Sequence, residues 1–148
     1  PPAKKIKSDY MWRDIERRAK FYGFEAKVPA PYPLKEFDLA NQIAILGMNE
    51  GWGVDYVYKT YQRWVQQGKE PATQPNLNEI FQELNLDSDD TLKKANAQEI
   101  KDKYLSNTAY AYKKGVFGSP TFVYDGKEVF WGDDRLEDCI KWIRLESK

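Results

Sequence analysis

The sequence predicts a mostly helical chain with a single antiparallel β-hairpin close to its C-terminal end. Up to Lys114, apolar residues recur at helical spacing in one segment after another. Beyond Gly115, the two short segments TFVY and EVFW are rich in β-branched and aromatic residues. Asp125-Gly126 lies between them, and this dipeptide is a strong hairpin signal. The period of the hydrophobic pattern therefore changes only once.

The first helix is expected from Lys7 to Tyr22, and Gly23 fits its end. Its apolar face is formed by Met11, Ile15, Ala19 and Tyr22. The prolines of VPAPYP, from Val28 to Pro33, then predict an extended connector, because each proline fixes its own φ and disfavours helix in the residue before it.

Two further helices are expected in the middle of the chain. The first runs from about Phe37 to Asn49, with a face of small residues that lets another helix approach closely; these are Ala40, Ala44 and Gly47. The second follows the sequence GWG, carries apolar residues at helical spacing between Val54 and Val65, and ends at Gly68.

Three shorter patterns complete the helical part. A short helix carries Leu77 to Leu84, and the next opens with Asp87 or Ser88 as its N-cap. A longer helix spans about Ala97 to Lys114, with Asn96 expected as N-cap.

The expected strands are Thr121–Tyr124 and Glu128–Trp131, and a last helix begins near Asp134. The inward face of that helix is expected to hold Leu136, Cys139, Ile140 and Ile143. A lone hairpin is marginally stable in water. Because its strands are apolar on both faces, either helices cover it well or partner strands lie outside this sequence.

Composition excludes several classes of function. The 148 residues hold 23 basic and 23 acidic side chains, so the net charge of zero argues against binding to nucleic acid or to an anionic membrane. No apolar run approaches the roughly 20 residues of a membrane helix. We expect a soluble, cytoplasmic protein.

The chain has no histidine and one cysteine. This excludes histidine-based triads and histidine-ligated metals, and we expect no metal site. Cys139 can form neither an internal disulfide nor a CxxC pair, and we expect it to be a small buried hydrophobe. Catalysis would have to use carboxylates, tyrosines, lysines, a hydroxyl or a borrowed thiol.

The stretch GVFGSPTFVYDGKEVFWGDDRLE resembles the C-terminal half of the thioredoxin-like 2-hydroxychromene-2-carboxylate isomerases and the kappa-class glutathione transferases. The opening, PPAKKIKSDYMWRDIERRAKFYG, is similar to the segment where those proteins enter a helical insertion. The resemblance covers essentially the whole chain. It implies an α/β, DsbA-like thioredoxin fold with a large all-helical insertion.

The resemblance also implies a division of the chain. Residues 5–95 resemble the helical insertion, and residues 96–148 the second half of the thioredoxin-like domain. The N-terminal βαβ half of the family is absent from this sequence, which starts at Pro1 without an initiator methionine. The family's catalytic serine, or a cysteine in its disulfide-exchanging relatives, would lie before Pro1, so we expect this chain alone to be inactive.

Several residues match positions that bind glutathione in the family. Ser119-Pro120 corresponds to the cis-proline loop, whose backbone pairs with a peptide-like ligand. Asp133 and Asp134 match the pair that holds the γ-glutamyl end, although serine or asparagine is more usual at the first position. Lys7 matches a lysine near the glycine carboxylate.

Other residues near these motifs have smaller expected roles. Tyr10, Trp12 and Trp131 line a pocket for a flat aromatic substrate or belong to the core, and Arg135 braces the Asp133-Asp134 loop. Without the resemblance, the sequence would predict a turn and an N-cap at Asp133 and Asp134. It would predict an ordinary trans proline at Pro120 and a surface lysine at Lys7.

The implied function is a glutathione-dependent isomerase or transferase that acts on a small aromatic carboxylate, with cis-trans isomerisation through a glutathione adduct. The resemblance leaves a homodimer open. One alternative is a thiol-disulfide oxidoreductase of the same superfamily, and another is a non-catalytic helical interaction module. The sequence upstream of Pro1 would discriminate among them, since Ser-Pro after a strand indicates the isomerase or transferase and CxxC the oxidoreductase.

Overall fold

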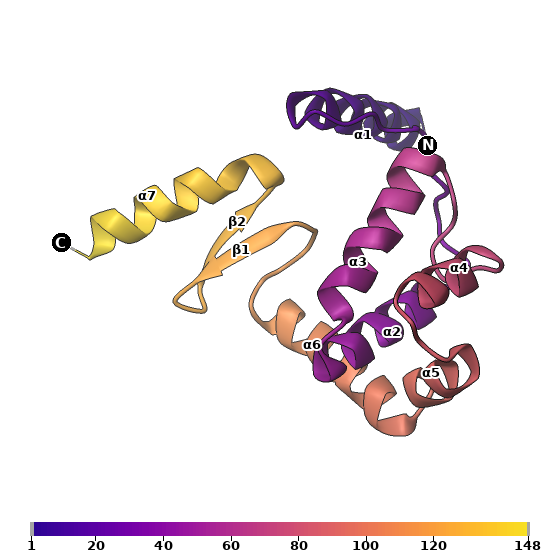
Figure 1. Cartoon of the computed structure of the whole chain (residues 1–148). Helices are drawn as coiled ribbons and strands as arrows, with labels where there is room; N and C mark the ends of the chain where they lie inside the picture. The colour runs from indigo at the N-terminus through magenta and orange to yellow at the C-terminus, as the bar shows by residue number, and fades with distance from the viewer. Residues whose placement is uncertain (1, 148) are drawn as a thin grey trace. The chain divides into compact units, whose positions relative to one another are not determined.

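The computed structural model describes residues 2–147 and divides into two compact units, Pro1–Lys101 and Asp102–Lys148. The described chain is mostly helical and contains one two-stranded sheet, as predicted (Figure 1). Within residues 2–147, no helix is both long and apolar enough to cross a membrane.

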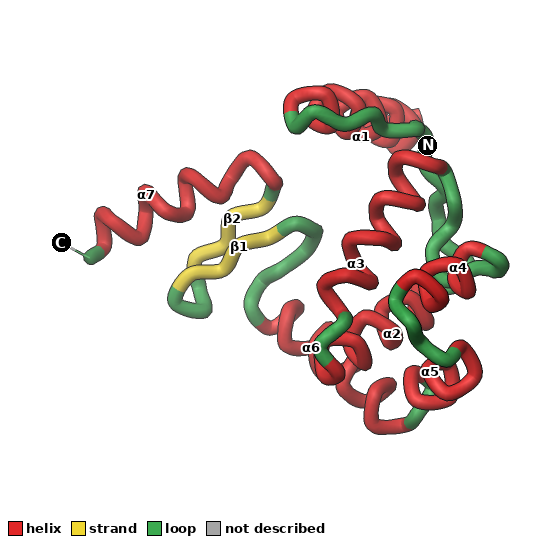
Figure 2. The backbone as a smooth tube through the Cα atoms, viewed as in Figure 1, coloured by secondary structure: helices red, strands yellow, loops and turns green. Residues whose placement is uncertain are grey.

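The elements follow one another in the order that the hydrophobic pattern predicts (Figure 2). Helix α6 belongs to the first unit at its start and to the second unit thereafter. The bounds are α1 Pro2–Phe21, α2 Phe37–Glu50, α3 Gly53–Tyr61, the π-helical turn η1 Gln62–Gln66, α4 Asn76–Glu83, α5 Ser88–Ala95, α6 Gln98–Lys113, β1 Thr121–Tyr124, β2 Glu128–Trp131, the 3-10 turn η2 Asp133–Arg135 and α7 Leu136–Glu146.

The first unit has a core shared by helices α2 to α6. Its buried apolar side chains are Ile43, Leu46, Tyr56, Leu77, Ile80, Phe81, Ala95 and Ile100. The end of α2 and the start of α3 approach closely at Gly47, where a Cβ atom would lie 2.6 Å from Cε3 of Trp52 and 2.7 Å from Cα of Gly53. The close approach predicted for the small-residue face of α2 is therefore found at Gly47.

The predicted apolar face of α1 is largely wrong. Ala19 is buried, but Met11 and Tyr22 are exposed. The helix instead carries ion pairs one turn apart, such as Lys5 with Asp9 and Lys20 with Glu16. Charged pairs at this spacing support a helix whose surface is solvated.

The predicted cap of α6 is also wrong. The amide Nδ2 of Asn96 donates to the carbonyl of Leu92 at 3.0 Å, so this side chain closes the end of α5 and does not open α6. The first turn of α6 is hydrogen-bonded to the carbonyl of Ala97. The N-cap of α5 is Asp87, whose Oδ1 accepts a hydrogen bond from the backbone N–H of Asp90 at 2.8 Å. Asp87 is one of the two residues predicted for this position.

The hairpin of the second unit has the predicted strands and pairing. Thr121 pairs with Trp131 and Tyr124 with Glu128 in an antiparallel register. Asp125 and Gly126 have φ values of 50° and 68°, the positive values that a type I′ turn requires.

Helix α7 packs on the hairpin and buries Cys139, as predicted. The prediction that Leu136 and Ile140 face inward is wrong, because both are exposed. In the described part of the second unit, α7 packs on the two short strands and on the adjoining turn η2. The strands cover the face of α7 that carries Cys139 and leave Leu136 and Ile140 exposed.

Candidate functional site

The entrance to strand β1 carries a backbone segment with unused hydrogen-bonding groups. The Ser119-Pro120 peptide bond is cis, as are three other X-Pro bonds, at Pro29, Pro33 and Pro75. Among the described residues, neither the N–H nor the C=O of Ser119 takes part in a hydrogen bond. The next carbonyl, that of Pro120, accepts from the N–H of Gly132 at 3.0 Å. The Ser119 backbone is therefore exposed and available beside the end of the sheet.

The acidic turn, formed by Asp133 and Asp134 at the start of η2, follows β2 and lies against this entrance. Gly132 has φ 130°, a value that residues with side chains rarely adopt. A Cβ atom on Gly132 would lie 2.6 Å from Oδ1 of Asp134, so the carboxylate folds back close over the backbone of this glycine. The turn is closed by the N–H of Arg135, which donates to the carbonyl of Gly132 at 3.2 Å. The sequence motifs pointed to Asp134 but not to Gly132.

Trp131 lies over the approach to Ser119. A Cβ atom on Gly118 would lie 2.6 Å from Nε1 of Trp131, so the indole ring rests on the backbone of Gly118. The rings of Phe117 and Trp131 have centroids 5.2 Å apart and planes inclined at 58°. Phe117 and Trp131 are both exposed. The two rings form an aromatic surface beside the Ser119 backbone. Of these two residues, only Trp131 had been singled out from the sequence.

The charges of the turn are negative and accessible. Asp133 and Asp134 are both exposed. Asp134 makes no ion pair with any residue in the range 2–147, whereas Arg135 pairs with Asp138 of α7 at 3.0 Å. The guanidinium of Arg135 is thus held toward α7, and the carboxylate of Asp134 remains available for a cation.

The remaining predicted residues lie on α1, in the first unit. Lys7 and Tyr10 are exposed, and the guanidinium of Arg17 stands 5.6 Å from the centre of the Tyr10 ring. Trp12 is partly buried and meets Tyr32 edge-on, with ring centroids 6.5 Å apart. The structure thus groups Ser119, Pro120, Trp131, Asp133 and Asp134 within the second unit, and it describes Lys7, Tyr10 and Trp12 with the first.

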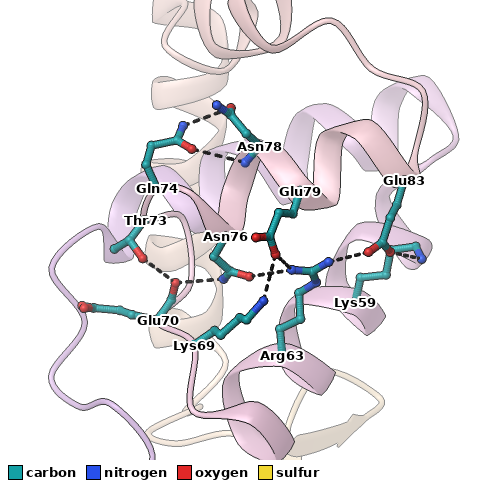
Figure 3. A network of polar contacts seen from close by, with 10 residues as sticks. All are labelled: Lys59, Arg63, Lys69, Glu70, Thr73, Gln74, Asn76, Asn78, Glu79 and Glu83. Atoms are coloured by element: carbon teal, nitrogen blue, oxygen red, sulfur yellow. Dashed lines mark hydrogen bonds and ion pairs between the residues drawn. The ribbon is translucent and has the colours of Figure 1, made fainter.

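A network of charged and amide side chains in the first unit was not anticipated from the sequence (Figure 3). Arg63, on η1, hydrogen-bonds to the carboxylates of Glu79 and Glu83 on α4, and its Nη1 lies 3.2 Å from Oδ1 of Asn76. The Arg63 side chain is 11% exposed, whereas both glutamates are 42% exposed. Arg63 therefore ties η1 to α4 from a largely buried position.

The network is completed by two lysines and shifts the titration of its members. Lys69 lies 2.8 Å from Glu79, and Lys59 lies 2.6 Å from Glu83. These lysines, followed by Arg63, lower the pKa of both glutamates. Burial acts to lower the pKa of Arg63, but the hydrogen bonds to Glu79 and Glu83 outweigh it and the pKa is raised. The network therefore favours the charged forms of Arg63, Glu79 and Glu83, as a structural tie does.

We expect Arg63→Met to lower the free energy of unfolding by about 1–2 kcal/mol, because it removes charge-assisted hydrogen bonds that are only partly screened by solvent. Urea denaturation at neutral pH measures this loss. The matched control is Lys5→Met, which breaks an exposed pair with Asp9 and should change stability by less than about 0.5 kcal/mol.

The same variant has a signature in the pH dependence of stability. The glutamate pKa values are lowered on folding, so their contribution is present above the unfolded value and is lost as the pH falls through the folded values. The decline of stability on acidification should therefore be shallower in Arg63→Met than in the unmodified chain. Parallel declines in the two proteins would show that Arg63 does not stabilise these carboxylates.

Comparisons with known proteins identify the family. The model of the DSBA-like thioredoxin domain matches residues 1–143. The chain belongs to this family. A solved structure of a 2-hydroxychromene-2-carboxylate isomerase superimposes with a TM-score of 0.78 at 26% identity, covering 95% of this chain and 68% of that one. The DsbA-like fold that the resemblance implied is confirmed.

Two relatives of the chain carry the names of enzymes. The 2-hydroxychromene-2-carboxylate isomerase of Pseudomonas putida is 26% identical over 132 residues, which are 89% of this chain and 63% of the isomerase. Glutathione s-transferase kappa 2 of Caenorhabditis elegans is 25% identical, over 93% of this chain and 67% of the transferase. The chain thus spans about two thirds of each relative's length.

Proposed function

We propose that the protein is a glutathione-dependent isomerase or transferase that acts on a small aromatic carboxylate. The observation that carries this proposal is the unpaired backbone of Ser119 beside the unpaired carboxylate of Asp134, on a DsbA-like chain related to an isomerase and to a glutathione transferase. In this proposal, residues 5–95 correspond to the helical insertion of the family, and residues 96–148 to the second half of the thioredoxin-like domain.

The residues of the acidic turn fit the γ-glutamyl end of glutathione. An exposed carboxylate such as that of Asp134 forms charge-assisted hydrogen bonds with an ammonium group. The second negative charge, on Asp133, strengthens the attraction for the ammonium and repels the neighbouring carboxylate of the same ligand end. The backbone N–H groups at the start of η2 and α7 are the groups that would compensate that carboxylate.

The cis-proline loop fits the peptide part of the ligand. Ser119 can offer one N–H and one C=O to an extended tripeptide, in the manner of a strand added to a sheet edge. Lys7 is proposed as the partner of the glycine carboxylate. Glutathione, when bound, supplies the thiol that the chain cannot, since its one cysteine is buried on α7.

The aromatic surface of Phe117 and Trp131 is proposed to contact the second substrate. Both rings are exposed beside Ser119, so a flat aromatic molecule can stack there without displacing core side chains. An aromatic substrate is supported by this surface and by the name of the isomerase relative.

The proposal is tested by three assays on the full-length protein, namely isomerisation of 2-hydroxychromene-2-carboxylate, conjugation of glutathione to an electrophilic aromatic compound, and reduction of a protein disulfide. We expect one of the first two activities, dependent on added glutathione and reduced in Asp134→Ala. Disulfide reduction that is independent of glutathione would favour the oxidoreductase. Failure of all three assays, without glutathione binding, would favour a non-catalytic helical module.

A further inference from the structure

Gly118, in the loop that leads from α6 to β1, has no room for a side chain because of one neighbour. A Cβ atom built on Gly118 would lie 2.6 Å from Nε1 of Trp131, 3.1 Å from Cε2 and 3.2 Å from Cδ1. These are the three nearest heavy atoms, and all belong to the same indole ring. A side chain at position 118 would therefore collide with Trp131 first.

The backbone conformation at Gly118 does not require glycine. Six other glycines of the described chain have positive φ values, which residues with side chains rarely adopt. Gly132 of the acidic turn is one of them, with φ 130°. The φ of Gly118 lies outside this range, so the local backbone is open to every residue. The glycine at this position makes room for the indole, not for an unusual turn.

The backbones of Gly118 and Trp131 are held at a fixed separation by Thr121. Oγ1 of Thr121 donates a hydrogen bond to the carbonyl of Gly118. Thr121 also pairs with Trp131 in the register of the hairpin. The N–H of Gly132, next to Trp131, donates to the carbonyl of Pro120 at 3.0 Å. A Cβ atom at position 118 is therefore accommodated by moving the indole, and not by moving the two chain segments apart.

The indole is the part of this arrangement that can move. Trp131 is 51% exposed, so its ring is not enclosed by the core. On one side it meets the ring of Phe117, which is 72% exposed, with the centroids 5.2 Å apart. The Gly118 backbone supports it on another side. The position of the Trp131 ring thus depends on Gly118.

We propose that Gly118 is a positioning residue that seats the indole of Trp131 beside Ser119 and so gives the site a preference for flat aromatic ligands. With the indole seated, the rings of Phe117 and Trp131 form one surface on which a planar molecule can stack. A side chain at position 118 turns the indole away and breaks this surface. The inference deepens the proposed function and rests on it, since this surface is the part proposed to contact the second substrate.

Calorimetric titration of 2-naphthol into the full-length protein, with saturated decahydro-2-naphthol as the non-planar comparison ligand, tests this inference. Both ligands are neutral, so the charges of the acidic turn do not decide the result. The unmodified protein should bind 2-naphthol more tightly. Gly118→Ala should weaken 2-naphthol binding by roughly two- to twelve-fold, because ring stacking is lost, and should change decahydro-2-naphthol binding by less than about two-fold.

A double-mutant cycle shows whether Gly118 acts through Trp131. Trp131→Ala should weaken 2-naphthol binding at least as much as Gly118→Ala does. Adding Gly118→Ala to Trp131→Ala should have no further effect, because no indole remains to be displaced. The matched control is Tyr112→Ala, which removes a ring that is 82% exposed on α6 and should leave both affinities unchanged. The indole N–H resonance of Trp131, assigned with Trp131→Phe, should shift in Gly118→Ala.

Three results would overturn the inference, provided that circular dichroism shows each variant to be folded. The first is a lack of preference for 2-naphthol in the unmodified protein. The second is an unchanged 2-naphthol affinity in Gly118→Ala. The third is an equal loss from Gly118→Ala with and without Trp131, which would show that Gly118 acts through the backbone alone. A preference for 2-naphthol without glutathione-dependent activity would instead contradict the proposed function and leave the role of Gly118 supported.

Discussion

Replacing Phe81 by alanine should lower the free energy of unfolding of the first unit by about 3–5 kcal/mol. The ring is 0% exposed and packs in the core shared by α2, α3, α4, α5 and α6. The substitution loses the transfer free energy of the ring and leaves a cavity that the surrounding helices can fill only in part. Because domains are typically stable by only about 5–15 kcal/mol, the loss is a large share of the total.

Urea denaturation followed by circular dichroism measures this change. The matched control is Phe21→Ala, which removes the same ring from a position that is 78% exposed. We expect the control to change stability by less than about 0.5 kcal/mol. Equal losses in the two variants would show that Phe81 does not occupy the centre of this core.

The second large effect is on glutathione affinity. Asp134→Ala should weaken binding by roughly ten- to a hundred-fold, because it removes a charge-assisted contact to the ligand ammonium worth about 1.5–3 kcal/mol. Calorimetric titration of glutathione into the full-length protein provides the measurement. Replacing Lys7 should cost less, since an exposed ammonium is screened by solvent.

Glu137→Ala is the matched control for Asp134→Ala. Glu137 is an exposed acid three positions further along the chain, in the first turn of α7. Its removal changes the net charge by the same amount without touching the acidic turn. If both variants lose affinity equally, the attraction is a general effect of charge, and the assignment of Asp134 fails.

Local signals explain why much of the fold could be predicted. The hairpin was predicted to the residue because the Asp125-Gly126 turn and the flanking β-branched residues act within a few positions of one another. The N-cap Asp87 is likewise a local contact. The same kind of signal failed at Asn96, because its side chain can bond back to Leu92 as well as forward into α6, and the sequence does not show which bond forms.

Features that depend on distant parts of the chain were not predictable in the same way. The exposure of Leu136 and Ile140 reflects how little of the described second unit packs on α7, which helical spacing alone does not reveal. A pocket that Leu34, Ala44 and Pro71 line together became visible only in the structure, because these residues come from separate segments of the chain.

The candidate site was predicted in part. The resemblance pointed to Ser119 and Asp134, which the structure places at the same end of the hairpin. It did not point to Gly118 or Gly132, although each is a small residue beside a bulky or charged neighbour that approaches its backbone closely. Gly132 lies between Trp131 and Asp133 in the sequence, a local signal that could have identified it, whereas Gly118 lies between Phe117 and Ser119 and meets Trp131 only in the fold.

Amide chemical-shift mapping of glutathione on the isotope-labelled full-length protein tests the central claim most directly. The account predicts saturable shifts that are largest at Ser119, Gly132 and Asp134 and that are strongly reduced in Asp134→Ala. The amides of the acidic turn and of the cis-proline loop should respond together, because one ligand contacts both. Unchanged amides at Ser119 and Asp134 at millimolar glutathione, with the hairpin shown to be folded, would contradict the proposed glutathione site.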